Sequence, residues 1–540
     1  MQLSKRVPYL VVAACSILYF LPFLRVLSHQ GDEGTLINGA VRVAEGQLPF
    51  RDFFEVMGPG TFYWLALFFK LLGTTWLATR ICLLFTTLGT TVLIFYLARR
   101  LRCGWEPVPV IFFVAVSYHN WNAISHHTDS NLVGLLSFAA LLSGLDRRQP
   151  FMLILAGVGA GITTWFMLPK GVLLCLSFIA TLWVIHRKDA CFRPYLTRLL
   201  GGYVLIVALV AALFWRAGGL PHLVYANLIW PLTNYSGINV VPYGLEFREL
   251  YWKSFSASFG AVAAPPVAAA ISTFLCIPFL IVMGLPLVLL TLGIRYKRAS
   301  FDRVVLPYWL VGLAFWFSEM HRKDLPHIAF GSPILIVLAF YLYRQVPGKW
   351  ASRALQLAGI SALALAMLNP LVALSAPARH TTRRGVVNVF GADAVLDFVT
   401  TRVKPGEPIF VYPYAPIYYF LSGAKNPTPF SILMYHMNTD SQFRTVVACL
   451  ESKKVRYVVW DRSFPTWVHK SFPAYRIPPV GEQIVEPFLL EHYRVVGGSE
   501  NGYQFLERKD STILRGDRAA AGGATGNQVI ADRLRGEHAQ

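Results

Sequence analysis

Polar residues in this chain are concentrated in four short stretches, and the first holds two adjacent carboxylates, Asp32 and Glu33. They follow an apolar run and precede a predicted short helix, 35–45, whose N-terminal dipole favours negative charge. A carboxylate in this place can take a proton from a hydroxyl group. Acidic residues here also serve as a plain helix N-cap, and the pair alone leaves both roles open.

The second and third stretches offer further candidates. Residues 50–55 (FRDFFE) place Asp52 and Glu55 among aromatic side chains, as in a binding site or an interfacial membrane anchor. Residues 125–129 (SHHTD) include two histidines and an aspartate. Side chains at successive positions diverge and no matching ligand set follows, so we predict no metal there.

The fourth stretch, 320–327 (MHRKDLPH), is strongly cationic and is followed directly by an apolar run. Arg322, Lys323 and His327 would suit the phosphate of a lipid at the membrane surface, Arg by paired hydrogen bonds and Lys as a point charge. Anchoring to lipid headgroups is the alternative. Arg80 and Lys170 are further cations that we expect near such a site.

Carboxylates opposite a cationic site suit the transfer of a sugar from a lipid phosphate. A carboxylate deprotonates the acceptor hydroxyl as it attacks the anomeric carbon, and cations stabilise the departing phosphate. Two carboxylates alone would equally permit glycoside hydrolysis, but the cationic cluster favours a lipid-phosphate donor. We expect no cofactor: the chain has no glycine-rich nucleotide loop, and nothing in the sequence requires a divalent metal.

The composition places these stretches in a membrane protein. Of 540 residues, 55% are hydrophobic and 14% are charged, whereas soluble domains carry roughly a quarter charged residues. The formal net charge of +20 comes from basic residues at the ends of apolar segments, where they set orientation. We therefore exclude nucleic acid as a partner and expect membrane lipids instead.

A helix needs about 20 residues to cross a bilayer. Segment 61–72 is too short, so we predict an interfacial helix there. Nearly every basic loop then faces the cytoplasm, as does the N-terminus, and the C-terminus lies outside. About 11 crossings are predicted, at 8–27, 81–98, 107–118, 132–145, 151–168, 172–185, 199–215, 267–294, 304–318, 328–343 and 354–375.

The predicted fold is an all-α polytopic membrane domain followed by a small α/β domain. Residues 1–376 form the membrane domain, in which 28–80 make the catalytic outer loop with interfacial helices. From 377 to 510 helix-like and strand-like segments alternate, which indicates a soluble α/β domain on the extracytoplasmic side. The tail, 511–540, has the composition of a disordered segment.

The chain resembles the GT-C superfamily of multi-pass glycosyltransferases that use polyprenyl-phosphate sugars. The branch is that of the dolichyl-phosphate-mannose protein mannosyltransferases and the bacterial aminoarabinose transferase. The resemblance rests on Asp32-Glu33, on residues 48–80, on HRKDLPHIAFGSPIL (321–335) and on VYPYAPIYYFLSGAKNP (411–427).

This resemblance implies roles for several residues. Asp32 is expected to be the catalytic base and Glu33 to orient the acceptor, with Glu55 as a second acidic residue near the site. Arg322 and His327 match a basic loop near the donor phosphate, and transfer is expected to invert the anomeric carbon.

One position departs from the resemblance. Aminoarabinose transferases carry a lysine directly after the second acidic residue, where this chain has Val56. The phosphate must therefore find its cation elsewhere, with Arg80, Lys170, Arg322 and Lys323 as candidates.

The sequence thus predicts a glycosyltransferase of the plasma (inner) membrane that works on its extracytoplasmic face. The expected donor is a polyprenyl-phosphate sugar, and the acceptor is a lipid, a polysaccharide or a protein. A transporter or flippase of lipid-linked sugars is the alternative, although the chain shows no inverted repeat. A non-catalytic scaffold that binds envelope glycans is a third hypothesis.

Overall fold

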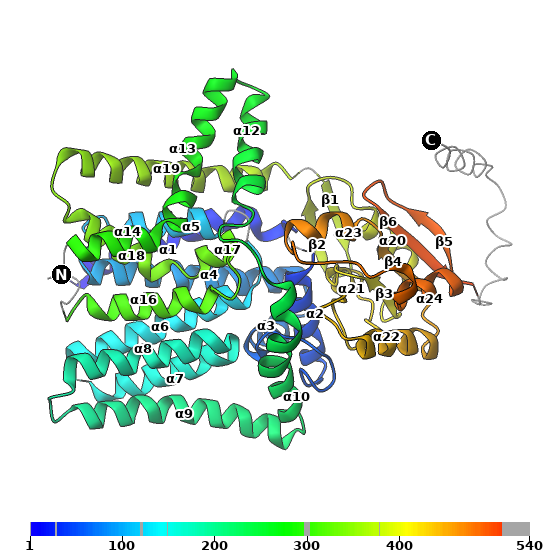
Figure 1. The fold of residues 1–540 in the computed structure, drawn as a ribbon, viewed down its shortest axis with the longest axis horizontal. Helices are drawn as coiled ribbons and strands as arrows, with labels where there is room; N and C mark the ends of the chain where they lie inside the picture. The colour runs from blue at the N-terminus through cyan, green and yellow to red at the C-terminus, as the bar shows by residue number, and fades with distance from the viewer. Residues whose placement is uncertain are drawn as a thin grey trace.

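The computed structural model describes residues 2–27, 30–118, 122–147, 149–295, 303–376 and 378–509. Figure 1 shows a bundle of roughly parallel helices with a small α/β domain packed against one end. The N-terminus lies at the opposite end of the bundle. The predicted disordered tail, 511–540, lies outside the described residues.

The membrane domain is built from helices that coincide with the predicted crossings. They are α1 (Gln2–Phe20), α4 (Trp76–Arg100), α5 (Pro107–Ser117), α6 (His126–Arg147), α7 (Pro150–Phe166), α8 (Leu168–His186), α9 (Phe192–Arg216), α13 (Pro265–Met283), α14 (Leu285–Arg295), α16 (Leu306–Glu319), α18 (Pro333–Arg344) and α19 (Lys349–Leu374).

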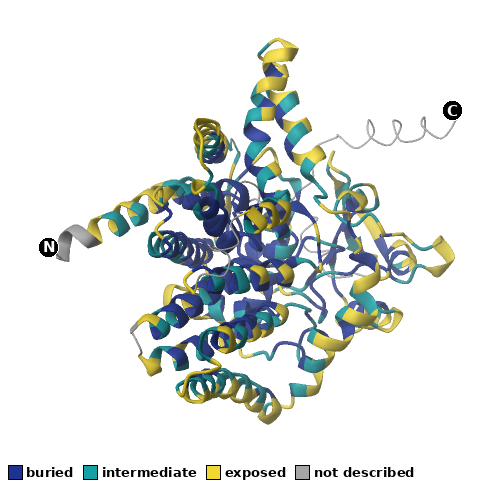
Figure 2. Cartoon of the chain, turned by 60° about the vertical axis from the view of Figure 1, so that its left-hand side comes forward, coloured by how far each residue is buried: buried dark blue, intermediate teal, exposed yellow. Residues whose placement is uncertain are grey.

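Length and composition agree with a membrane-spanning bundle. Within the described residues, 7 helices are long and apolar enough to cross a membrane, and four shorter apolar helices accompany them. The outer faces expose large apolar side chains, as on α9, where Leu205 and Leu213 are 61% and 58% exposed. Figure 2 shows buried residues where the elements pack together and exposed ones on the outer faces. In a bilayer these faces contact lipid.

One predicted crossing, 267–294, is wrong as a single helix. It consists of α13 and α14, which meet at Gly284. Pro286 has no backbone N–H to continue the hydrogen-bonding pattern of α13, so the chain changes direction there. Together with α12 (Lys253–Gly260), α13 forms a hairpin that projects transverse to the bundle in both views (Figures 1 and 2).

The end of the bundle next to the α/β domain carries short helices. α2 (Asp32–Ala44) and α3 (Pro59–Leu72) pack against each other, and α3 contacts α4. With 14 residues, α3 is too short to cross a bilayer, as expected of an interfacial helix. The loop after α9, which the sequence predicts to be an outer loop and which we call the outer loop, adds α10 (Leu220–Val224), η2 (Tyr225–Ile229), η3 (Pro231–Tyr235), α11 (Ser236–Ile238) and η4 (Phe247–Trp252).

Two further short elements complete this end of the bundle. The 3-10 helix η1 (Leu21–Arg25) extends α1. Helix α17 (Leu325–Phe330) precedes α18, so the predicted crossing 328–343 is interrupted at Gly331 to Pro333. The Asp324 side chain accepts a hydrogen bond from the His327 N–H and caps α17.

The C-terminal domain has the predicted alternation of helices and strands. Its sheet has the order β3-β4-β6-β5, with β3 and β4 parallel and the other pairs antiparallel. The elements are β3 (Ile409–Tyr412), β4 (Tyr457–Asp461), β5 (Tyr493–Gly498), β6 (Tyr503–Arg508), α20 (Ala394–Arg402), α21 (Ile417–Ser422), α22 (Asp440–Ser452), α23 (Phe464–Trp467), η5 (Val468–Lys470), η6 (Val480–Glu482) and α24 (Val485–His492).

An antiparallel hairpin, β1 (Ala378–Thr382) and β2 (Gly385–Val389), joins the two domains and was not predicted. The Leu27 N–H donates to the Asn388 carbonyl at 2.9 Å and the Trp76 N–H to the Arg384 carbonyl at 2.6 Å. These bonds attach the hairpin to the membrane domain and fix the α/β domain over the end of the bundle.

Candidate active site

A cavity of about 1670 Å³ lies where the membrane helices, the outer loop and the α/β domain meet. Its polar lining comes from α2, α6, the loop after α9, the segment between α16 and α17, and the α/β domain. Apolar residues from the outer loop, α12 and α19 line another part, namely Leu228, Leu232, Leu250, Phe255, Phe259, Leu368 and Val372. The cavity therefore offers both polar and lipid-like surroundings.

Asp32 lies at the first turn of α2 and lines the cavity. Its Oδ1 accepts a hydrogen bond of 2.6 Å from the Tyr414 hydroxyl, which comes from the loop after β3. Burial, and then the Asp32 charge, raise the pKa of Tyr414 well above its usual value, so Tyr414 stays a hydrogen-bond donor. A side chain at Gly31 would overlap the Tyr414 ring, so the glycine allows this approach. We call Asp32, Glu33 and Tyr414 the carboxylate corner.

Glu33, next in sequence, points away from the cavity. It is fully buried and forms an ion pair with Arg80 on α4. Its Oε1 also accepts a hydrogen bond of 2.9 Å from the Ile124 N–H, and the Arg80 guanidinium lies over the Trp76 ring. Neither Glu33 nor Arg80 lines the cavity. The pair connects α2 to α4 inside the protein.

Asp52 and Glu55 also lie outside the cavity lining. Asp52 pairs with exposed Arg51 at 2.8 Å and accepts a hydrogen bond from the Leu48 N–H. Glu55 is buried, which raises its pKa to about 8, despite an opposing hydrogen bond to Ser431. Its carboxyl group is therefore protonated at neutral pH.

Arg322 lies in the segment between α16 and α17, on the cavity wall, and its guanidinium is fully engaged. It pairs with Asp324, donates to Asn239 Oδ1 at 2.8 Å and donates to the Ser471 carbonyl of the α/β domain. Burial opposes the Asp324 charge, but His327 and Arg322 together hold the pKa of Asp324 well below its usual range. We call Arg322, Lys323, Asp324 and His327 the cation corner.

Lys323 differs from its neighbour. Its side chain is exposed to the cavity and makes no ion pair with any residue that the structure describes. His327 is held by Asp324, whose Oδ1 lies 2.5 Å from its Nδ1. Glu246, whose neighbour Leu245 pairs with Asp324, lies beside the cation corner, and burial and then the Asp324 charge raise its pKa to about 7. Lys323 is thus the cation with a free ammonium group at this corner.

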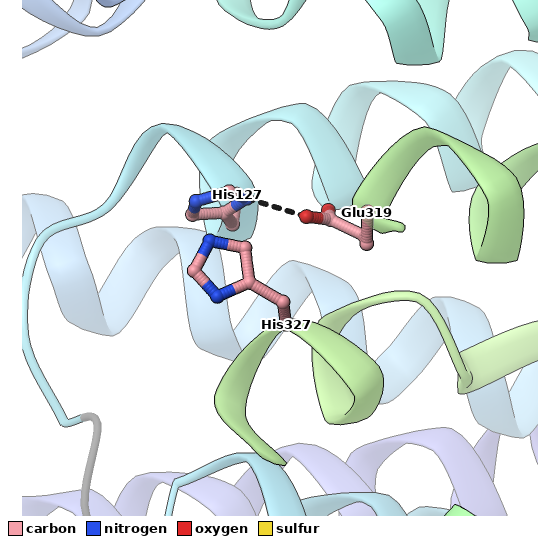
Figure 3. A group of neighbouring side chains, drawn as sticks. All are labelled: His127, Glu319 and His327. Carbon is pink, nitrogen blue, oxygen red and sulfur yellow. Dashed lines mark ion pairs between the residues drawn. The ribbon is translucent and has the colours of Figure 1, made fainter. Parts of the chain in front are cut away.

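A second set of charges lies beside the cation corner. His127 Nδ1 lies 2.8 Å from Glu319 Oε2 (Figure 3). Lys170 Nζ lies 2.6 Å from Glu319 Oε1. Lys170 and Glu319 are fully buried and do not line the cavity, whereas His127 does. Lys170, which was predicted as a possible partner of the donor phosphate, is therefore paired with the Glu319 carboxylate inside the bundle.

Sequence reasoning gave no role to several of these residues. Tyr414 and Glu246 lie outside the four polar stretches, and Glu319 directly precedes the fourth; only the folded chain brings Glu319 next to His127. Tyr414 falls within the 411–427 segment that carries the resemblance, which was the one signal that pointed to it.

The chain is mostly helical with a small C-terminal sheet, and this fold has a counterpart among solved structures. No protein-family model matches the sequence, and no curated protein matches it. ArnT from Cupriavidus metallidurans, solved in the apo state, shares the fold with a TM-score of 0.51 and 13% identity, over 94% of this chain and 98% of ArnT. At this identity the likeness concerns the fold alone.

The arabinofuranosyltransferase AftD from Mycobacteria aligns with a TM-score of 0.48 and 14% identity. The alignment covers 93% of this chain but 40% of AftD, so this chain spans less than half of the length of that protein.

Proposed function

We propose that this chain is an integral-membrane glycosyltransferase that moves a sugar from a polyprenyl-phosphate donor to an acceptor hydroxyl. The observation that carries the proposal is a single cavity with Asp32 on one wall and Lys323 on another, beside an apolar lining. The fold shared with ArnT, an aminoarabinose transferase, supports the same class of reaction.

In this proposal Asp32 is the general base. Its carboxylate takes the proton of the acceptor hydroxyl as the hydroxyl oxygen attacks the anomeric carbon of the donor. The bond between that carbon and the phosphate oxygen breaks, and the phosphate leaves with the bonding electrons. Attack from the side opposite the leaving phosphate inverts the anomeric carbon. Tyr414 holds the carboxylate in place through its 2.6 Å hydrogen bond.

The cation corner takes the donor phosphate. Lys323 is assigned the direct contact because its ammonium group is unpaired among the described residues and faces the cavity. Arg322, whose donors are already engaged, holds the local structure and adds positive potential. Stabilisation of developing charge in this way often contributes more than any other effect to the catalysis of group transfer.

The apolar part of the cavity takes the polyprenyl chain. Leu232 and Phe259, from the outer loop and α12, belong to its lining. We place the reaction on the extracytoplasmic face, because basic residues favour the cytoplasmic side. The connection between α8 and α9, which carries Arg187 and Lys188, lies at the opposite end of the bundle from the α/β domain (Figure 1).

The test is to incubate the purified full-length protein with a panel of polyprenyl-phosphate sugars and candidate acceptors, followed by mass spectrometry. A new glycosidic bond on one acceptor, with release of polyprenyl phosphate, supports the proposal. A protein that moves labelled lipid across vesicles and forms no glycosidic bond with any member of the panel would overturn it in favour of a flippase.

A further inference from the structure

Three side chains with metal-ligating atoms converge beside the cation corner. They are His127 at the start of α6, Glu319 at the end of α16 and His327 in α17 (Figure 3). One ligand atom from each lies within 4.8 Å of those of the other two. We call these three residues the histidine cluster. Because they come from three separate helices, no local sequence pattern predicts that they meet.

The cluster is built into the protein wall. His127 is 5% and Glu319 0% exposed, and His327 is half-buried. Both histidines line the cavity. Chance groups of acidic residues and histidines collect on exposed surfaces, whereas placing these groups in the interior carries a desolvation cost that needs a partner.

The 2.8 Å contact between His127 and Glu319 is an ion pair without hydrogen-bond alignment. Among the described residues, neither His127 Nδ1 nor Glu319 Oε2 has a hydrogen-bond partner. Buried polar atoms without such a partner are rare and call for an explanation. An ion that both atoms could coordinate would satisfy them.

The surroundings orient the ligands. Asp324 holds Nδ1 of His327, which leaves Nε2 directed toward His127 (Figure 3). A carboxylate behind a histidine in this way is the usual support of a metal-ligating imidazole. Lys170 pairs with Oε1 of Glu319 and donates hydrogen bonds to Ser130 and Asn131. Oε2 of Glu319 is the oxygen that lies toward the two histidines of the cluster.

We propose that the histidine cluster binds a divalent transition-metal ion of the zinc type. Two imidazoles and one carboxylate suit Zn²⁺ and its neighbours better than Mg²⁺ or Ca²⁺, which prefer oxygen ligands. Metal bonds of about 2.0 to 2.2 Å require small shifts of the side chains, because an ion between His127 and Glu319 must separate two atoms that now lie 2.8 Å apart. Three protein ligands leave at least one coordination position open toward the cavity.

The charge of the site defines what takes the open position. Lys170 already neutralises Glu319, so a bound divalent ion keeps its positive charge toward the cavity. An anionic oxygen, such as that of a phosphate, is the ligand that such a centre attracts. This last step rests on the proposed function, whereas metal binding itself does not.

The experiment measures metal binding without any donor. Full-length protein in detergent is freed of metal by a chelator and titrated with Zn²⁺ by calorimetry, and with Co²⁺ by visible absorption. We expect one Zn²⁺ per chain. His127→Ala and His327→Ala each weaken binding by at least about tenfold, and Asp324→Asn, which leaves the ligands in place, by about 10- to 100-fold.

Two control variants separate this site from others. His126→Ala removes a neighbouring histidine of the same cavity, and Cys191→Ser disrupts a half-exposed group with His186 and Asp189 on the far side of the bundle. Both should keep full Zn²⁺ affinity, and gel filtration checks that every variant is folded. Absence of stoichiometric binding, or binding that survives His127→Ala and His327→Ala, overturns the metal site.

Transfer assays then separate the two proposals. If the protein binds Zn²⁺ at the cluster but transfers no sugar, the proposed function fails and the metal site stands. If the metal-free protein transfers sugar at the full rate, the donor phosphate does not need the metal, and its proposed binding at the open coordination position is overturned.

Discussion

The carboxylate corner and the cation corner are arranged alike. In each corner two residues of the same charge are adjacent in sequence, and one of them forms an ion pair within the protein. Glu33 is paired with Arg80 and Arg322 with Asp324, whereas Asp32 and Lys323 face the cavity. The paired residue holds the structure together and the other is available for chemistry.

The two corners differ in how the available residue is held. Asp32 is fixed by a hydrogen bond from Tyr414, while no ion pair restrains Lys323 among the described residues. A base must be placed accurately against the attacking hydroxyl. A cation that follows a departing phosphate gains from a flexible stem, which lysine has.

The largest expected effect is that of Asp32→Asn. Loss of a general base lowers the rate by about 10²- to 10⁴-fold, while the polar, isosteric amide leaves the fold intact. The rate of transfer and the elution volume in gel filtration check both statements. Asp440→Asn, at an exposed position at the start of α22, is the matched control and should keep the wild-type rate. Near-normal activity of Asp32→Asn would remove Asp32 from the mechanism.

Glu33→Ala should act on stability. It leaves the buried Arg80 charge without its partner, which costs about 3 to 5 kcal/mol. Thermal unfolding in detergent should therefore begin at a clearly lower temperature than in wild type. The double variant Glu33→Ala and Arg80→Met removes both charges and should regain much of the loss. If Glu33→Ala were as stable as wild type, the distinction between a structural Glu33 and a cavity-facing Asp32 would be contradicted.

Lys323→Gln should lower kcat/KM for the polyprenyl-phosphate donor. A hydrogen bond to a charged group contributes about 1.5 to 3 kcal/mol, so kcat/KM for the donor should fall by roughly 10- to 100-fold. The protein should remain as stable as wild type because Lys323 has no partner among the described residues. Lys253→Gln, an exposed lysine paired with Glu249, serves as the control. Equal effects of the two substitutions would argue against a phosphate contact.

Tyr414→Phe removes the hydroxyl that holds Asp32 but keeps the ring. Since water from the cavity can replace the lost hydrogen bond in part, we expect a cost of about 1 kcal/mol, seen as a several-fold lower kcat. Tyr435→Phe, which removes a hydroxyl that donates to Glu486 within the α/β domain, is the matched control. A loss as large as that of Asp32→Asn would mean that Tyr414 itself takes part in proton transfer.

Glu55 should affect the stability of the protein in a pH-dependent way, with little direct effect on transfer because it does not line the cavity. Burial raises its pKa from 4.5 to about 8, so the folded protein holds this proton in a range where the unfolded chain has lost it. Its contribution to stability is therefore present below about pH 4.5 and is lost as the pH rises to about 8. Glu55→Gln should gain stability relative to wild type over this range, measured by melting temperature. A difference in melting temperature between Glu55→Gln and wild type that does not change with pH would contradict the raised pKa of Glu55.

The sequence predicted the class of the fold and most of its elements, because long apolar runs and the alternation after residue 377 are local signals. It could not predict the break at Gly284, where a largely apolar run of 28 residues, 267–294, was interpreted as one crossing. The hairpin of β1 and β2 was also not predicted, since its pairing depends on contacts with the membrane domain.

The site was predicted in part. Asp32, Arg322, Lys323 and His327 line one cavity, as their shared location on one face required. Glu33 does not, because successive residues of a helix point about 100° apart and sequence adjacency does not tell which of the two faces the cavity. Arg80 does not either, because it pairs with Glu33 in the interior. The partners of His127 lie about 190 to 200 positions away, beyond the reach of any local pattern.

The hydrogen bond between Asp32 and Tyr414 joins residues 382 positions apart. During synthesis Asp32 emerges with the first helix, whereas Tyr414 follows only after all the membrane helices have been made. The carboxylate corner is therefore completed late, when the α/β domain has folded onto the bundle. A partly synthesised chain already inserted in the membrane holds its carboxylate without this support, so full activity belongs to the finished protein.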